Sequence, residues 1–115
     1  MSPLLVTALE EAQALSASRG WSAPSDTTVR EAERLLTLVA QEWRAPIVQV
    51  QPSGAISLEW EAGAHGWLTL TVEGHGTLEH SAVIEGDEYA QVEGFGDKLP
   101  LWGDALLRRL LGFGH

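Results

Sequence analysis

Histidine is the residue type in this chain best suited to metal binding or acid–base chemistry, and three histidines fall in one short segment. The expected strands place His65 and His75 in turns at opposite ends of one strand, on the order of 18 Å apart, which is too far to share an ion. His75 and His80 could approach each other with Glu73 or Glu79 as a third ligand, but no recognised ligand spacing is present. We therefore expect no metal site and interpret these histidines as solvent-exposed turn residues.

Carboxylates and hydroxyls are the second set of candidates for chemistry. Glu59 and Glu61, with Glu79 on a neighbouring strand, could form an acid–base pair, but that chemistry needs one carboxyl group held in an apolar pocket. The alternating pattern instead places all three on a polar face. No serine lies in a G-x-S-x-G elbow, and the absence of cysteine excludes disulfides, thiolate metal sites and cysteine nucleophiles. We expect neither an enzyme nor a bound cofactor.

Charge is distributed unevenly along the sequence. Seven Lys and Arg against sixteen Asp and Glu give a formal net charge of −9. No Lys or Arg occurs from Ala45 through Asp97, a segment that contains Glu59, Glu61, Glu73, Glu79, Glu85, Asp87, Glu88, Glu93 and Asp97. A negative field of one sign repels nucleic acid and anionic membranes and attracts basic partners. We therefore expect a basic protein as the partner, with no direct binding to nucleic acid or membrane.

The length and composition predict a single domain covering residues 1–115. With 44% hydrophobic and 20% charged residues, the chain is long enough to bury a core without disulfides or a structural metal. The N-terminal apolar run lacks a preceding basic region, so it does not fit a signal peptide, and no run approaches the roughly 18 apolar residues of a membrane span. These features, together with the absence of cysteine, predict a cytoplasmic protein.

Helical spacing of apolar residues indicates two helices near the N-terminus and one at the C-terminus. The second helix is the clearest: Thr28 and Glu31 fit a capping box, with Ser25 or Asp26 as alternative caps, and Pro46 enforces its end. The expected helices cover about residues 2–20, 26–43 and 99–111.

Alternating apolar and polar residues between the helices indicate a β-sheet. Short turns join the runs, which favours an antiparallel meander over parallel crossovers. The expected strands are Ile47–Gln51, Ala55–Trp60, Trp67–Val72, Thr77–Ile84 and Tyr89–Phe95. The fold class is therefore α+β: two N-terminal helices, a four- to five-stranded antiparallel β-meander, and one C-terminal helix packed on the sheet.

The five tryptophans divide between core and surface. Trp43, Trp60 and Trp102 fall on apolar stripes and are expected in the core. Trp67 points away from the apolar face of its strand, where an aromatic ring within an acidic surface could anchor a partner, and Trp21 is a second candidate. The expected partner-binding residues are Glu59, Glu61, Trp67, Glu79, Tyr89 and Glu93. The alternative is that the acidic face only keeps the protein soluble and that Trp21 and Trp67 pack under the helices.

Two segments carry a resemblance to other proteins. PIVQVQPSGAISLEW (residues 46–60) and GFGDKLPLWGDALLRRLL (residues 94–111) resemble a loose class of small bacterial and phage-borne proteins, from the second helix to the C-terminus. In size and charge the chain is also similar to small acidic antitoxin, immunity and anti-defence inhibitors. These motifs are structural, so the resemblance carries no catalytic residue across and implies only a role in protein binding.

From charge, pattern and resemblance we expect a non-enzymatic inhibitor. Its acidic sheet would block a basic, nucleic-acid-binding face of a target protein. One alternative is a small enzyme or ligand-binding domain with His80 or Glu59 in a pocket between helices and sheet. Another is an assembly subunit that forms a homodimer through an edge strand or the first helix.

Overall fold

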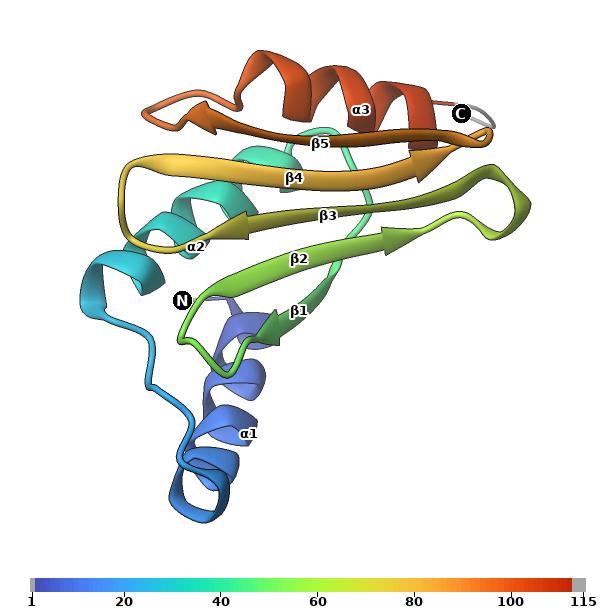
Figure 1. Cartoon of the computed structure of the whole chain (residues 1–115). Coiled ribbons are helices and arrows are strands. Elements are labelled where there is room, and N and C mark those ends of the chain that lie inside the picture. The colour runs from blue at the N-terminus through green and yellow to red at the C-terminus, as the bar shows by residue number, and fades with distance from the viewer. Residues whose placement is uncertain (1, 113–115) are drawn as a thin grey trace.

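Short turns between the β runs make strands that are neighbours in the sequence neighbours in the sheet. The computed structural model describes residues 2–112, and the five strands lie in the order β1-β2-β3-β4-β5 with every pair antiparallel (Figure 1). The strands are β1 (Ile47–Val50), β2 (Ile56–Glu61), β3 (Gly66–Val72), β4 (Thr77–Ile84) and β5 (Asp87–Gly94), and the helices are α1 (Pro3–Arg19), α2 (Asp26–Ala40) and α3 (Leu101–Leu111). The predicted α+β fold is confirmed, with five strands in the meander.

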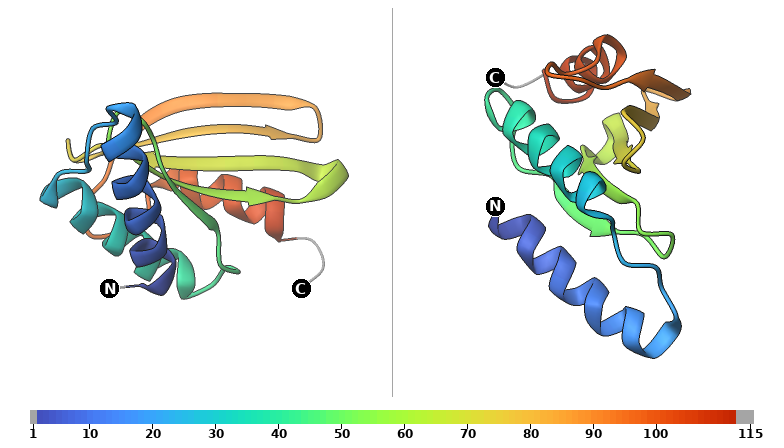
Figure 2. Two further views of the ribbon diagram at one scale, coloured as in Figure 1. Left: turned by 90° about the horizontal axis from the view of Figure 1, so that it is seen from below. Right: turned by 90° about the vertical axis from the view of Figure 1, so that its left-hand side faces the viewer.

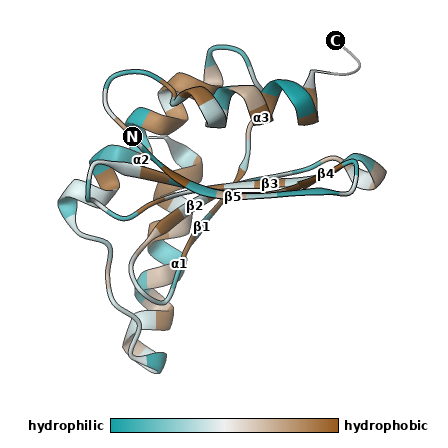
Figure 3. Cartoon of the chain, turned by 45° about the horizontal axis from the view of Figure 1, so that its top comes forward, coloured by the Kyte–Doolittle hydropathy of each residue, from teal (hydrophilic) through white to brown (hydrophobic). Residues whose placement is uncertain are grey.

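All three of these helices lie on one side of the sheet and leave its other face bare. Figure 1 looks onto the bare face with α1 and α2 behind it, and Figure 2 shows the two layers from two further directions. The helix α1 packs against β1, α2 against β2 and β3, and α3 against β3 and β4. Figure 3 shows the sheet nearly edge-on, with α2 and α3 on the same side.

Alternation within the strands supplies the core on the helix side. Register places Trp60 of β2 opposite Leu68 of β3, and Leu68 opposite Ala82 of β4, so this face carries an apolar layer in which His80 is the polar residue of β4. Its fully buried side chains include Trp60, whose indole Nε1–H donates to the Arg44 carbonyl over 2.9 Å. The helix α2 adds Ala32, Leu35, Leu36 and Val39 from its apolar stripe.

The two N-terminal helices begin at the residues that the sequence indicates. Pro3 occupies the first turn of α1, and Gly20 follows its last residue. Of the alternative caps for α2, Ser25 is the one used: its Oγ accepts the Thr28 N–H over 3.1 Å. The predicted capping box at Thr28 and Glu31 is therefore wrong, and Glu31 bonds elsewhere.

Glu31 ties α2 to the turn between β3 and β4. Its side chain is only 3% exposed, yet both carboxylate oxygens have partners: Oε1 accepts the Gly74 N–H over 2.8 Å and Oε2 accepts the Gly76 N–H over 2.7 Å. Charge-assisted hydrogen bonds offset the cost of burying the carboxylate. This contact fixes α2 relative to the meander across a separation of more than forty residues.

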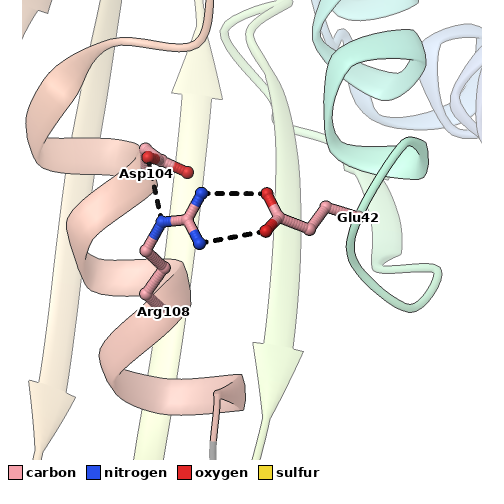
Figure 4. Close-up of polar contacts among 3 residues, drawn as sticks. All are labelled: Glu42, Asp104 and Arg108. Atoms are coloured by element: carbon pink, nitrogen blue, oxygen red, sulfur yellow. Dashed lines mark hydrogen bonds and ion pairs between the residues drawn. The ribbon is translucent and has the colours of Figure 1, made fainter. Parts of the chain in front are cut away.

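Arg108 ties α3 to the segment that follows α2. Its guanidinium donates to both oxygens of Glu42 over 2.9 and 3.0 Å, and its Nε donates to Asp104 over 3.2 Å (Figure 4). Its Cζ also lies 5.6 Å from the centre of the Trp43 ring. The hydrogen bonds to Asp104 and then to Glu42 raise the pKa of the Arg108 guanidinium above its ordinary value.

Further details of the fold differ from the sequence prediction, and one is that α2 ends at Ala40 rather than near Trp43. Glu85 and Gly86 both have positive φ, as a two-residue type I′ hairpin requires, so β5 begins at Asp87 rather than Tyr89. Trp102 is not a core residue: it is 45% exposed, because Gly103, Leu106, Leu107 and Leu110 form the buried stripe of α3. None of the helices within residues 2–112 is both long and apolar enough to cross a membrane.

Candidate protein-binding face of the sheet

The sheet face opposite the helices is called the open face. Strand alternation and register assign its side chains, because the buried residues of β2, β3 and β4, apart from Ser57, point the other way. Four of these described residues are glutamates, none is Lys or Arg, and most of the others are small or hydroxylated. The set is Ile47, Gln49, Ser57, Glu59, Glu61, Trp67, Thr69, Thr71, Thr77, Glu79, Ser81, Val83, Glu88, Ala90 and Val92.

Four of the predicted partner-binding residues meet on the open face. Glu61 pairs with Trp67 across β2 and β3, Glu59 pairs with Thr69, and Glu79 pairs with Thr71. The predicted alternation that sends Ile56, Leu58 and Trp60 to the core and Glu59 and Glu61 to the other side is present in the structure. The acidic residues and the aromatic residue therefore share one surface.

Trp67 lies in the middle of a row of side chains that crosses four strands. The row runs Glu61, Trp67, Val83 and Glu88 from β2 to β5, with a carboxylate at each end. Trp67 is 37% exposed, so part of its ring is available to a partner. Sequence reasoning did not single out Glu88, because its place depends on the β4–β5 turn; the signal that could have located it is the Glu85-Gly86 hairpin dipeptide.

An open hollow of about 390 Å³ lies beside this row. It is lined by Trp67, Ser81, Ala82, Val83, Glu88, Tyr89 and Ala90. An indole wall together with a carboxylate suits the side chain of Lys or Arg, whose cation is attracted to both groups and whose methylene stem covers apolar surface.

The other two predicted residues, Tyr89 and Glu93, lie on the helix side of β5. Arg109 of α3 places its Cζ 5.5 Å from the Tyr89 ring centre and donates to the Tyr89 hydroxyl, while its Nη2 lies 2.8 Å from Asp87 Oδ2. Glu93 accepts the N–H groups of Trp102 and Gly103 over 2.9 and 3.1 Å, at the first turn of α3. Both side chains hold α3 against the sheet and do not join the open face.

The three histidines do not gather at one site. His65, beside Glu85, and His75 are exposed residues at opposite ends of β3, in agreement with the prediction, but His80 is only 1% exposed and lies among the core residues of β4. Its Nδ1 lies 3.8 Å from Glu93 Oε2 and has no hydrogen-bond partner. Within residues 2–112 no group of three or more His, Asp or Glu side chains is placed to hold a metal ion.

The alternative of a pocket between helices and sheet named His80 or Glu59. Glu59 lies on the open face, and His80 is buried in the core beside Glu93 and does not line the cavity near α2. A cavity of about 420 Å³ does occur near α2, but apolar residues dominate it, among them Leu4, Leu36, Val39 and Trp43.

Comparison of the chain with protein-family models, with curated proteins and with solved structures finds no match. The strand register places Glu59, Glu61, Glu79 and Glu88 on the open face together with Trp67.

Proposed function

We propose that this protein is a non-enzymatic binding protein whose open face docks onto a basic surface of a target protein. The observation that carries the proposal is the composition of that face: four glutamates and an exposed tryptophan, without one basic side chain among its described residues. Where the basic surface of the target binds nucleic acid, docking would block it, and the protein would act as an inhibitor.

The placement of the arginines supports a negatively charged open face. Arg34 donates to the Gly96 carbonyl, Arg44 donates to the Glu61 carbonyl, and Arg108 and Arg109 bond to acidic partners, so each is engaged within the chain on or near a helix. Within residues 2–112 none of the four open-face glutamates forms a salt bridge with a basic side chain, although the Arg44 guanidinium reaches the main chain of Glu61. A surface of one sign steers an oppositely charged partner and increases the association rate, most strongly at low ionic strength.

Trp67 supplies the apolar part of the proposed contact. Exposed indole rings are among the commonest hot-spot residues of interfaces, and removal of one typically costs about 2 kcal/mol or more of binding free energy. That cost corresponds to about a 30-fold weaker Kd. A Lys or Arg side chain of the target would enter the hollow between Trp67 and Glu88.

The test is affinity capture with immobilised wild-type protein and charge variants. Glu61→Lys and Glu79→Lys change the open face, and Glu10→Lys makes the same change in charge at an exposed position of α1. We expect one basic protein to be retained by the wild type and by Glu10→Lys, and to be lost from both variants of the open face and from Trp67→Ala. Association of the isolated pair should slow as salt is raised.

The proposal would be overturned if all four variants retained the same partner, or if binding were equal at low and high salt. The inhibitory step is tested separately with a nucleic acid bound to the captured partner. Displacement of that nucleic acid by the wild type, but not by Glu79→Lys, would support inhibition; a stable ternary complex would overturn it.

A further inference from the structure

The two edges of the sheet differ in how they are protected. Strand β1 has four residues, is bounded by Pro46 and Pro52, and has α1 packed against it. Strand β5 has eight residues, contains neither Pro nor Lys, and pairs with β4 in a continuous register without a bulge. Proteins usually protect an edge strand with proline, lysine, a short length or a covering element, because an unprotected edge pairs with other chains.

The hydrogen-bond ladder shows which β5 groups are free. The Glu85 N–H donates to the His65 carbonyl, and the Phe95 N–H donates to the Gly76 carbonyl. In an antiparallel ladder hydrogen-bonded and non-hydrogen-bonded pairs alternate. The Glu85 bond shows that odd-numbered residues of β4 bond to β3, so even-numbered residues of β4 bond to β5. Their partners in the register are the odd-numbered residues of β5. The N–H and C=O groups of Glu88, Ala90 and Val92 therefore point outward along the edge.

Little covers this edge among the described residues. Val92 is 62% exposed, and Glu88 and Ala90 are exposed as well. In Figure 3 β5 runs along the near edge of the sheet, with α3 to one side. The side chains of Glu88 and Ala90 also line the hollow beside Trp67, so the edge and the hollow are continuous.

We propose that the β5 edge accepts an extended, basic segment of the partner as a sixth strand of the sheet. The inference rests on the proposed function and adds a binding mode to it: main-chain hydrogen bonds to Glu88, Ala90 and Val92, with a Lys or Arg of the added strand in the hollow. Charge selects this occupant, because the exposed Glu88 forms no salt bridge with a described basic side chain, while Asp87, paired with Arg109, and Glu93, bonded to α3, add negative charge to the same strand.

A second copy of the chain is a poorer occupant. Antiparallel pairing of two β5 strands about Ala90 would place Asp87 opposite Glu93 of the other copy. Arg109 pairs with Asp87 and α3 binds Glu93, but neither contact removes the like charge of the two opposed carboxylates, which destabilises a strand pair. Each copy also carries a net charge of −9. A basic segment would instead place positive side chains opposite Asp87 and Glu93.

The first test uses a synthetic peptide of alternating lysine and valine, titrated into the ¹⁵N-labelled full chain. We expect backbone amide shifts at Glu88, Ala90 and Val92, and little change along β1. The matched control is the same peptide N-methylated on alternate residues, which keeps its charge but cannot pair with an edge. The N-methylated peptide should bind at least about tenfold more weakly than the unmethylated one, because backbone hydrogen bonds are lost.

The possible outcomes distinguish binding at the β5 edge from binding at the open face. Equal shifts with both peptides, or shifts confined to Glu61 and Trp67, would overturn the sixth-strand proposal and leave the proposed docking of the open face standing. No shifts with either peptide would also overturn the sixth-strand proposal, whereas the capture experiment decides the face independently. A dimer in sedimentation equilibrium that Ala90→Pro abolishes would show that a second copy occupies the edge.

The second test changes the protein. Ala90→Pro removes an outward N–H that β4 does not use, so the sheet should remain folded, and Ala90→Val adds bulk but keeps the donor. We expect the lysine–valine peptide to bind Ala90→Val normally and Ala90→Pro about tenfold more weakly. Equal binding to the two folded variants would refute the proposal; if Ala90→Pro does not fold, the N-methylated peptide decides.

Discussion

Replacing Glu31 with glutamine is the sharpest test of how the helices are held on the sheet. The buried carboxylate accepts the Gly74 and Gly76 N–H groups with its two oxygens. Glutamine keeps the shape of the side chain, but it offers one oxygen and one NH₂ group. One of the two turn amides would therefore face a donor instead of an acceptor.

The expected loss follows from these two contacts. A hydrogen bond to a charged group contributes about 1.5–3 kcal/mol, and a buried donor left unsatisfied costs about 1–3 kcal/mol. Because one bond is lost and the other loses its ionic character, Glu31→Gln should lower the free energy of unfolding by about 2–4 kcal/mol. That is a large part of the roughly 5–15 kcal/mol that typically stabilises a domain.

Equilibrium urea unfolding, followed by tryptophan fluorescence, measures this change. The matched control is Glu73→Gln, which removes the same charge from an exposed position in the same turn and should shift the free energy by no more than about 0.5 kcal/mol. Hydrogen exchange at Gly74 and Gly76 should accelerate only in Glu31→Gln. The reasoning is refuted if Glu31→Gln matches the wild type within about 0.5 kcal/mol, or if both variants lose the same stability.

Three further predictions concern single positions. Gly66→Ala should prevent folding or cost several degrees in Tm, because an added Cβ would lie 1.8 Å from the Val83 carbonyl oxygen at a φ of 130°; a normal Tm would contradict this. His80→Leu should leave the urea midpoint unchanged or raise it, since it removes a buried Nδ1 that has no hydrogen-bond partner; a large decrease would show that the 3.8 Å contact with Glu93 stabilises the fold. Glu93→Gln should accelerate hydrogen exchange at Trp102 and Gly103 without changing exchange in α2, and uniform acceleration would count against a local role.

The faces of the sheet could be predicted from the sequence because side chains alternate strictly along a strand. Ile56 and Leu58 lie in the core while Glu59 and Glu61 lie on the open face, as the pattern indicates. The prediction that Trp67 points away from the core needed only the same rule. No long-range information was required for these assignments.

Assignments that depend on contacts between distant segments could not be made in this way. Glu31 resembles a capping residue in the sequence, but its partners lie in a turn more than forty residues away. Glu93 and Tyr89 were expected on the acidic surface, yet the two-residue Glu85-Gly86 turn sets a register that directs them toward α3. Trp102 was expected in the core, because helical spacing alone does not reveal that Gly103 is the residue facing β3 and β4.

The bare side of the sheet has a consequence for how this chain can vary. Thr69, Thr71 and Ser81 share their strands with the core, but their side chains contribute little to it, so substitutions there should be tolerated while the core side stays constant. A library that randomised these three positions together with Gln49 and Ala90 would sample new recognition surfaces on an unchanged frame. Because the open face and the core use different side chains of the same strands, natural selection could change the binding partner without changing the core residues.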